Sequence, residues 1–351
     1  MRIAQVSPLY ESVPPALYGG TERVVSYLTE ELIKAGHEVV LFASGDSKTG
    51  AELVPVCECA LRLSPREVDP VAFHFLLMEE VLRRAPSFDI IHSHIDCIGF
   101  IISRRTATPL ISTLHGRLDL LEHEFIFREY GEAPVISISN AQRRPLAGAN
   151  WAATVYHGIP KDLYTFNEKG GGYLVYVGRV SPEKRVDSAI EIARMTGLPL
   201  KIAAKVDKID RDYFNSVIRP LLDGPDVEFI GEITDKEKNA LVGSALAFLH
   251  PIDWPEPFGL SMLEAMACGT PVIARRRGSI PEVVDHGVTG FIFETDEEAA
   301  RYITKLCPDF SRKACRERFE ERFLSERMAR DYVGAYAALL EKRGGGKRGG
   351  Q

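Results

Sequence analysis

The strongest constraint on the fold of this chain is a pattern of strand, glycine-containing loop, helix and strand that occurs twice. Its first copy predicts strands over residues 2–7 and 37–44, separated by a loop and by a helix that begins near Thr21. Four apolar residues of that helix recur at helical spacing, namely Val24, Val25, Leu28 and Leu32. Units of this kind build parallel sheets with right-handed crossovers.

The same pattern restarts near residue 173 and predicts strands over residues 173–178 and 200–205. Between them, Ser181 is placed to cap a helix that has Pro182 at its first position. Further short apolar runs predict buried strands at residues 227–231, 245–250 and 271–274. Two starts of one pattern in a chain of 351 residues predict two α/β domains.

Composition along the chain sets the expected boundaries of these domains. We expect an N-terminal domain over residues 1–160, a linker rich in Pro, Gly and polar residues over 161–172 and a second domain over 173–322. Residues 316–341 follow a helical pattern, and their last part, residues 323–341, either packs on its own domain or crosses back to the first. Residues 342–351 are rich in Gly, Lys and Arg and are expected to be disordered.

Overall composition argues against several classes of function. The net charge is −6 and no half of the chain is strongly basic, which argues against a dedicated nucleic-acid-binding protein. The chain contains no run of 18 apolar residues, so we expect no membrane-spanning helix, which leaves peripheral attachment to a membrane open. The six cysteines lack a repeating zinc spacing, and Cys57-x-Cys59 is interpreted as an incidental pair. A reducing cytoplasm is therefore the expected location.

The most informative stretch is HPIDWPEPFGLSMLEAMACGTPVIA, over residues 250–274. It predicts a short strand, a loop framed by prolines, and a helix from about Phe258 to Gly269. The first amides of that helix, at Phe258, Gly259 and Leu260, would point outward without partners. Together with the helix dipole they form an anion site suited to a diphosphate.

Two glutamates flank this predicted anion site. Glu256 and Glu264 would lie roughly 12 Å apart at the rise of a helix, which is too wide for the carboxylate pair of a glycosidase. The separation suits two hydroxyl-rich groups on either side of a diphosphate, namely a sugar and a ribose. The alternative is that Glu256 caps the helix and Glu264 is solvated, but Glu264 lies among apolar residues.

Two cations follow the strand at residues 173–178. Arg179 comes directly after Gly178, at the carboxyl end of the strand, where open α/β sheets bind ligands. Lys184 lies near the start of the next predicted helix, where a cation is unfavourable unless an anion binds there. The pair could neutralise a diphosphate, or both could be surface cations, and Arg185 is a third basic residue nearby.

Weaker signals lie elsewhere in the chain. Gly19 and Gly20 precede a helix and could approach a diphosphate, and His115 follows a predicted strand. The pattern His92-x-His94-x-Asp96 could hold a metal ion, although a strand end with alternating polar residues is the preferred interpretation. The pattern Asp210-Arg211-Asp212 matches the DxD of metal-dependent sugar transferases, but its place at a predicted helix start favours capping.

Taken together, these segments resemble the retaining glycosyltransferases of family 4 (glycosyl transferases group 1), which have the GT-B fold. The resemblance is carried by the spacing of Glu256 and Glu264 within EPFGLSMLEAMACGTPVIA, and by the segments GRVSPEK, LYGGTERV, STLHG, ISISNAQ and HGI, which occur in family order over nearly the whole chain. It implies two Rossmann-like βαβ domains whose parallel sheets face an interdomain cleft. The second domain would bind a nucleotide-sugar.

The resemblance also implies a role for each candidate residue. Glu264 would hold the ribose and Glu256 the sugar hydroxyls, while His115 would lie near the reacting face of the sugar. The implied catalytic set is Glu256, Arg179, Lys184 and His115. The implied nucleotide-sugar-binding set is Gly19, Gly20, Lys205, Ile233, Phe258, Gly259, Leu260 and Glu264. No metal ion or other cofactor is implied, because Arg, Lys and the helix start would take its place.

Three positions depart from the family pattern. Pro160 stands where Asp often follows the HGI segment, and Gly278-Ser279 stands where two glycines usually precede PE. The segment AAKVD at residues 203–207 replaces a common glycine-containing loop, so Lys205 is expected to make a donor contact of its own. These departures bear on how the donor is bound and leave the expected fold unchanged.

We therefore expect a transferase that moves a hexose, with glucose from UDP-glucose as the first choice, to a saccharide or another hydroxyl acceptor. Residues 57–80, with Arg62, Arg66, His74 and Phe75, either line the acceptor site or form a helix that covers the sheet. The alternatives are a nucleotide-sugar epimerase of similar fold and a non-catalytic nucleotide-sugar-binding subunit. A nicotinamide oxidoreductase is disfavoured, because no G-x-G-x-x-G follows the first strand.

Overall fold

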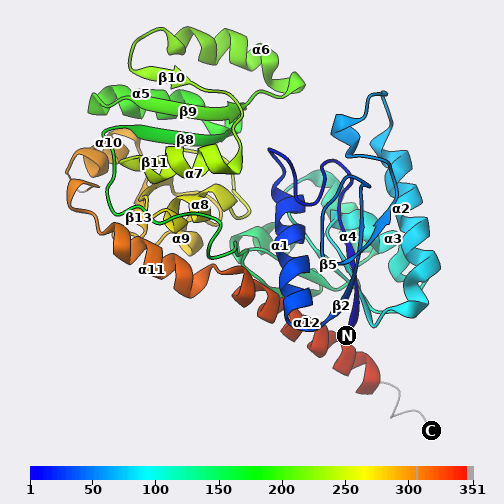
Figure 1. Ribbon diagram of the computed structural model, residues 1–351. Helices are drawn as coiled ribbons and strands as arrows, with labels where there is room; N and C mark the ends of the chain where they lie inside the picture. Colours follow the sequence, from blue (N-terminus) through cyan, green and yellow to red (C-terminus); the bar gives the residue numbers. More distant parts are fainter. Residues whose placement is uncertain (306, 346–351) are drawn as a thin grey trace. The chain divides into compact units, whose positions relative to one another are not determined.

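A computed structural model describes residues 1–305 and 307–345 of the chain (Figure 1). The chain divides into two compact units, each with a parallel sheet of its own. Unit 1 comprises Met1–Gly158 together with the chain from Ser325 onward, and unit 2 comprises Ile159–Leu324. Among the described residues, no helix combines the length and the apolar character needed to span a bilayer.

Unit 1 is built on a sheet of seven parallel strands in the order β3-β2-β1-β4-β5-β6-β7. The strands are β1 Arg2–Val6, β2 Glu38–Ala43, β3 Glu52–Pro55, β4 Ile90–Ser93, β5 Leu110–Thr113, β6 Val135–Ser137 and β7 Trp151–Thr154. The helices are α1 Gly20–Lys34, α2 Pro70–Arg84, α3 Phe100–Ser103, α4 Leu121–Glu129 and α12 Ser325–Gly345. The strand order reverses between β1 and β4, which is where Rossmann-like sheets bind ligands.

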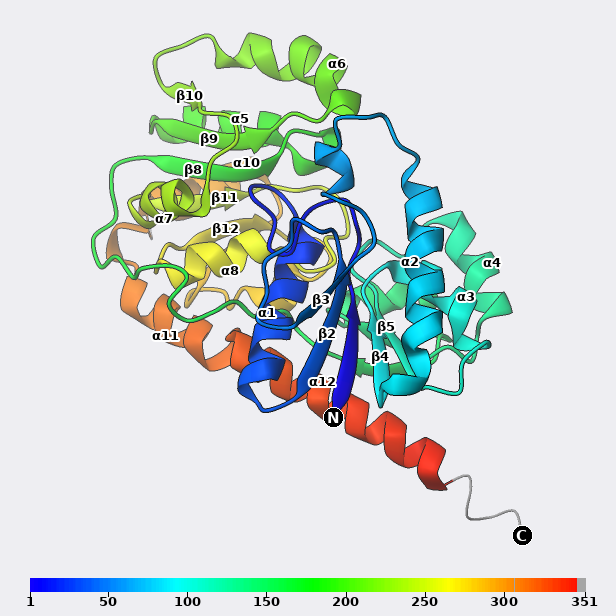
Figure 2. The same ribbon diagram turned by 45° about the vertical axis from the view of Figure 1, so that its right-hand side comes forward.

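The alternation of side chains along β2 places α1 and α2 on opposite faces of this sheet (Figure 2). Leu41 packs with Val25 of α1 in one apolar cluster. Its neighbour Phe42 packs with Leu77 and other residues of α2 in another. Both faces of the sheet are therefore covered, as a parallel sheet requires.

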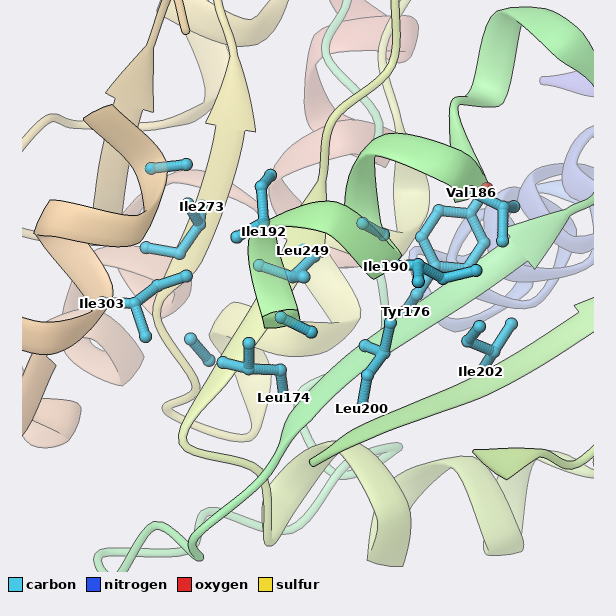
Figure 3. Close-up of a cluster of buried hydrophobic side chains, with 14 of the residues drawn as sticks. Leu174, Tyr176, Val186, Ile190, Ile192, Leu200, Ile202, Leu249, Ile273 and Ile303 are labelled. Atoms are coloured by element: carbon cyan, nitrogen blue, oxygen red, sulfur yellow. The ribbon is translucent and has the colours of Figure 1, made fainter. Parts of the chain in front are cut away.

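Unit 2 repeats this architecture with six parallel strands in the order β10-β9-β8-β11-β12-β13. The strands are β8 Leu174–Arg179, β9 Leu200–Lys205, β10 Val227–Phe229, β11 Ala247–His250, β12 Val272–Arg275 and β13 Gly290–Phe293. The helices are α5 Val186–Thr196, α6 Arg211–Tyr213, α7 Asp235–Gly243, α8 Leu260–Ala267, α9 Ile280–Val283, α10 Asp296–Lys305 and α11 Arg312–Arg322. Figure 3 shows part of its main apolar core, where Ile190 of α5 and Ile303 of α10 lie over strand residues such as Leu249. The two parallel α/β sheets predicted from the sequence are confirmed.

The start of α5 differs from the prediction. Ser181 makes no side-chain cap, and residues Pro182–Lys184 form an isolated 3-10 turn instead. Arg185 then adopts a left-handed conformation, with a φ of 53°, so the α-helix begins only at Val186. The side chain of Asp187 accepts a hydrogen bond from Nε of Arg185 at 3.0 Å and supports this turn.

Two further boundaries differ from the expected ones. The predicted linker belongs to unit 2, where Tyr164 is only 1% exposed and Ile159 pairs with Leu324 in a β-bridge. The long C-terminal helical pattern is broken at residues 323–324 into α11 and α12, which belong to different units. Within unit 1, α12 runs beside α1, and Oγ of Ser325 lies 3.2 Å from Oε1 of Glu31. Residues 342–345 are helical, and the rest of the predicted tail lies outside the described residues.

Arg312, at the start of α11, is a buried cation that is satisfied by oxygens of neutral groups. Its guanidinium donates to the carbonyl oxygens of Asn167, Gly243 and Ala245 at 2.7–2.9 Å. It also donates to Oγ1 of Thr270 at 2.8 Å. One side chain thus ties the segment before β8 to the loops around β11 and β12.

We expect the substitution Arg312→Met to lower the free energy of unfolding of unit 2 by about 3 kcal/mol, because several buried acceptors lose their donor. Its neighbour Lys313 is 76% exposed, so Lys313→Met provides a matched control that should change stability by less than about 0.5 kcal/mol. Trp151 lies in unit 1 and Trp254 in unit 2. Denaturant unfolding followed by fluorescence in a Trp151→Phe background therefore reports on unit 2 alone. Equal effects of the two substitutions would contradict the structural role of Arg312.

Candidate functional site

The candidate site of unit 2 gathers on the loops that follow its strands at their carboxyl ends. The strand order of this sheet reverses between β8, which ends at Arg179, and β11, which ends at His250. Ligands of open α/β sheets bind outside such a reversal. The structure therefore places Arg179 at the carboxyl end of β8 and Lys184 and Glu256 on the segments that follow β8 and β11.

Glu256 is buried and lies at the centre of this group of loops. Its Oε2 accepts hydrogen bonds from Nζ of Lys184 at 2.6 Å and from Nε1 of Trp254 at 2.8 Å. The ammonium group of Lys184 also lies 4.6 Å from the ring centroid of Trp254. Burial raises the pKa of Glu256, but the positive charge of Lys184 and these hydrogen bonds outweigh it, so the pKa lies below its ordinary value. The carboxylate is charged at neutral pH.

The turn around Gly278 holds the backbone of Glu256 in place. The amide of Ser279 donates to the carbonyl oxygen of Glu256 at 2.9 Å. A Cβ atom added at Gly278 would lie 2.3 Å from that carbonyl oxygen and 2.4 Å from the amide nitrogen. Ser279 departs from the family pattern of two glycines before PE. Gly278 matches that pattern, and no side chain fits at its position.

The helix α8 begins at Leu260, two residues later than predicted. Gly259 precedes it with a φ of 90°, a conformation that favours glycine. Phe258, predicted to offer a backbone amide to the ligand, has a side chain that is only 1% exposed. The first turn of α8 contains no acidic residue that would compete with an anion.

His250 is a site residue that the sequence analysis missed. It ends β11 and is buried, and no residue in the described part of the chain hydrogen-bonds to its Nε2. This atom would lie 3.5 Å from a Cβ at Gly259, so it points toward the start of α8. Burial lowers the pKa of His250 to about 4 despite the nearby Glu256 carboxylate, so the imidazole is neutral. A strand-ending histidine is the only sequence signal that could have identified it.

Glu264 lies inside α8 and is buried in an ion pair. Its Oε1 accepts from Nζ of Lys238 at 2.7 Å, and Lys238 also lies 3.1 Å from Asp235 on its own helix, α7. The predicted solvated alternative for Glu264 is therefore wrong. Sequence reasoning also missed Lys238, because no local pattern links a residue of α7 to one of α8.

Arg179 is surrounded by carboxylates. Its Nη2 donates to Oε1 of Glu183 at 2.8 Å, and its guanidinium lies 3.7 Å from carboxylate oxygens of Asp207 and Asp210. Asp210 makes no side-chain cap, contrary to the sequence-based interpretation, because it faces Arg179 instead. Lys205 lies at the end of β9 and pairs with Asp207 at 3.2 Å. Ile233 is half-buried in the loop before α7.

The glycine loop of unit 1 leads into α1 as predicted. Gly19 caps the helix, and Gly20 is its exposed first residue. Two buried glutamates, Glu11 and Glu22, lie beside this helix start. Burial and the negative charge of Glu11 raise the pKa of Glu22 to about 7. The start of α1 therefore differs from that of α8, because it carries acidic groups.

His115 follows β5 in unit 1 and is partly exposed. Its Nε2 lies 2.9 Å from Nδ1 of His94, and its backbone amide donates to Oδ1 of Asp96 at 3.0 Å. No group of three or more metal-ligating side chains is placed to hold a metal ion within residues 1–305 and 307–345. His92 and His94 are instead buried in hydrogen bonds to other side chains.

The segment predicted as either an acceptor site or a covering helix forms α2 over residues Pro70–Arg84. His74 is buried there, and its ring bonds to the backbone of Pro70 and Leu9. Arg62 pairs with Glu11 at 3.1 Å, while Phe75 is 61% exposed. Arg62, Arg66 and Phe75 are all exposed, whereas His74 is not.

Comparison with known proteins identifies the class to which this fold and site belong. Residues 165–322 match the family model of glycosyl transferases group 1, and residues 18–158 match that of glycosyltransferase family 4. The chain is therefore a glycosyltransferase built from two Rossmann-like domains, with structural neighbours of the GT-B class. It belongs to the group 1 glycosyltransferase family, as the resemblance in its motifs indicated.

Individual relatives agree with this assignment. The chain is 28% identical to the glycogen synthase of Mycobacterium tuberculosis over 83% of its own length and 81% of that protein. It is 27% identical to an uncharacterised glycosyltransferase of Methanocaldococcus jannaschii over 59% of its own length, and the match spans 61% of that relative. The structure of Anabaena HepE in complex with UDP-glucose has the same fold, with a TM-score of 0.72, 20% identity and coverage of 96% and 100% of the two chains.

The packing of Gly278 against Glu256 yields a test of this part of the site. We expect Gly278→Ala to displace Glu256 and to reduce transfer activity by about 100-fold or more, because the new methyl group would overlap the Glu256 backbone. Gly287 also has a positive φ, of 83°, but nothing lies within 4 Å of a Cβ there. Gly287→Ala should therefore cost about 1 kcal/mol of stability and leave activity unchanged. Similar activities for the two variants would contradict the proposed packing.

The raised pKa of Glu22 predicts a pH-dependent contribution to the stability of unit 1. Its carboxyl binds a proton more tightly in the folded state, so this contribution is complete below pH 4.5 and is lost as the pH rises through 7. Glu22→Gln should therefore stabilise unit 1 by up to about 3 kcal/mol at pH 8 and have little effect near pH 4.5.

Unfolding monitored at Trp151 in a Trp254→Phe background, between pH 4.5 and 8, measures this difference. Glu79→Gln is the control, because Glu79 is exposed on α2 and should show no such trend. A pH-independent effect of Glu22→Gln would show that the pKa of this carboxyl is the same in the folded and the unfolded chain.

Proposed function

We propose that this glycosyltransferase transfers a hexose, with glucose from UDP-glucose as the first choice, to a hydroxyl group of a saccharide or another acceptor. We further propose that transfer retains the anomeric configuration and needs no metal ion. The observation that carries the proposal is the cluster of Lys184, Glu256 and His250 beside the start of α8 in unit 2.

The chemistry of this cluster suits a sugar diphosphate. Nζ of Lys184 has three hydrogens, and the bond to Glu256 uses one of them. Oε2 of Glu256 is occupied by Lys184 and Trp254, while no described residue hydrogen-bonds to Oε1. The lysine can therefore donate to a phosphate oxygen while the glutamate accepts a hydrogen bond from a sugar hydroxyl.

Glu264 is suited to bind the nucleoside at the other end of a nucleotide-sugar. Oε1 of Glu264 is taken by Lys238, which leaves Oε2 for ribose hydroxyls. The carboxylate accepts from Lys238 on an apolar helix, and a carboxylate forms stronger hydrogen bonds than a neutral acceptor. A hydroxyl pair such as that of a ribose is the group that fits it.

Positive charge for the leaving diphosphate is available without a metal ion. Lys184, Arg179 and the amide groups at the start of α8 can all stabilise negative charge. The choice of UDP-glucose is supported by the Anabaena neighbour, which is described in complex with that donor. Retention is supported by the family resemblance of the motifs that contain Glu256 and His115.

A thermal-shift screen of UDP-, GDP- and ADP-sugars against the full chain tests the choice of donor. A ligand that binds the folded state at 100 times its Kd stabilises it by about 2.7 kcal/mol. We expect the largest shift with UDP-glucose and its reduction in Glu264→Gln and Lys184→Met. Lys236→Met, an exposed lysine on α7, should respond like the unmodified protein. No shift with UDP-glucose and a clear one with another donor would overturn this choice.

Transfer assays then separate the remaining alternatives. Transfer that survives EDTA and yields the retained anomer, as judged by NMR of the product, would support the proposal. Isomerised donor formed without acceptor would indicate an epimerase, and tight binding without turnover would indicate a binding subunit. Loss of transfer in EDTA, or an inverted product, would refute the metal-independent retaining mechanism.

A further inference from the structure

Seven polar side chains form an unbroken series through the interior of unit 1. Gln5 of β1 and His92 of β4 are register partners in adjacent strands, and His94 lies two residues further along. Side chains two residues apart project to the same face of a strand. The series is completed by residues of the next strand and of the C-terminal helix, namely Thr113, His115, Tyr332 and Tyr336.

The contacts run from His115 to Tyr332 without a gap. On the first side, Nε2 of His115 lies 2.9 Å from Nδ1 of His94, and Nε2 of His94 lies 2.8 Å from Oε1 of Gln5. On the second side, Nε2 of Gln5 lies 3.3 Å from the hydroxyl of Tyr336, which lies 2.6 Å from Nδ1 of His92. Nε2 of His92 then lies 2.7 Å from Oγ1 of Thr113. Oγ1 of Thr113 donates to the hydroxyl of Tyr332 at 3.2 Å.

The side-chain amide of Gln5 determines the direction of every hydrogen bond in this series. Its oxygen can only accept, so Nε2 of His94 carries the hydrogen between them. A neutral His94 then accepts at Nδ1, and Nε2 of His115 must donate. On the other side the amide nitrogen donates to Tyr336, whose hydroxyl donates to His92, and the same direction continues to Tyr332.

The three histidines of the series are neutral. Burial lowers the pKa of His92 and His94 well below the ordinary value, and it also lowers that of His115. The series itself contains no carboxylate that could stabilise an imidazolium. Each ring therefore has one nitrogen that donates and one that accepts. The hydrogens of the series can be arranged in only two ways, one for each orientation of the Gln5 amide.

We propose that this series, through the orientation of Gln5, fixes His115 in the tautomer that carries its hydrogen on Nε2 and presents the lone pair of Nδ1 as an acceptor. No residue in the described part of the chain hydrogen-bonds to that Nδ1. Gln5 and His94 are positioning residues, since they act through His115. The use of the lone pair rests on the proposed function, because the family resemblance implies that His115 lies near the reacting face of the transferred sugar.

The series also explains why the last helix belongs to the same unit as the first strand. Tyr332 and Tyr336 of α12 are fully buried, and they supply a hydroxyl on either side of His92 in the series. Without α12, Nε2 of Gln5 and Nδ1 of His92 would both lose the hydroxyl of Tyr336 and would keep only their direct contact of 3.5 Å. The series thus joins residues more than 300 positions apart in the sequence.

Imidazole 15N NMR of the full chain, labelled at histidine, tests the inference without requiring any substrate. We expect Nδ1 of His115 to show the shift of an unprotonated ring nitrogen and Nε2 that of a protonated one, with the resonances assigned in His115→Gln. A hydrogen on Nδ1, or averaged shifts of a tautomer mixture, would overturn the proposal. Because no donor is present, this outcome is independent of the choice of UDP-glucose.

Two variants then test whether Gln5 sets the direction. Gln5→Met has a similar length but neither donates nor accepts at this point, so His115 should lose its single tautomer. Tyr332→Phe removes a buried hydroxyl at the far end of the same series and should leave His115 unchanged, which makes it the matched control. If Gln5→Met fails to fold, Tyr336→Phe serves in its place. Nε2 of Gln5 lies 3.5 Å from Nδ1 of His92 and can donate to that ring directly, so both His92 and His115 should keep their tautomers in this variant. A fixed His115 in folded Gln5→Met, or a mixture of His115 tautomers in Tyr336→Phe, would contradict the proposal.

Kinetics connects the tautomer to transfer. We expect Gln5→Met to lower kcat about 10-fold with little change in the KM for UDP-glucose, since it changes the hydrogen bond at His115 and leaves the charged groups of unit 2 intact. An unchanged kcat in a variant whose His115 tautomer is demonstrably mixed would show that the lone pair has no role in transfer.

Discussion

The contact between Lys184 and Glu256 is the interaction on which the site of unit 2 depends. It joins the turn after β8 to the loop after β11, across the point where the strand order reverses. Burying one of these charges alone would cost several kcal/mol, so each requires the other, and Trp254 supplies a further hydrogen bond. The contact thus joins two loops that share a backbone hydrogen bond, from the amide of Asp253 to the carbonyl oxygen of Glu183 at 2.9 Å, beside it.

The same principle extends to the other charged residues of unit 2. Arg179 is paired with three carboxylates, and Glu264 is paired with Lys238. The site is therefore electrically compensated before any ligand binds. A diphosphate could share the donors of Lys184, whose ammonium group has more hydrogens than its bond to Glu256 uses. The ion pairs keep such a site folded without a ligand. They also neutralise part of its positive charge, so its attraction for anions is weaker.

The sequence was sufficient to predict the two sheets and the residues that carry the family motifs. Alternating and continuous apolar runs predict β1, β8 and their helices, because those signals are local. It was not sufficient for Lys238 or His250, whose partners or targets lie on other segments of the chain. The isolated turn before α5 depends on the left-handed conformation of Arg185, which a non-glycine residue rarely adopts and no local pattern predicted. The break between α11 and α12 was hidden by an apolar spacing that continues through it.

The two units share the order of six strands, with a seventh strand at one edge in unit 1, but they place their polar groups differently. In unit 2 the ionised residues lie on loops beyond the strands, whereas in unit 1 neutral polar residues such as Gln5 and His92 lie within the strands themselves. Charged groups can exchange an ion-pair partner for a ligand only in loops that water reaches. In a buried series of neutral groups, each atom either donates or accepts, so the direction of the hydrogen bonds is fixed. One topology therefore supports two kinds of chemistry, and which kind arises depends on whether the polar residues occupy strand positions or the loops that follow.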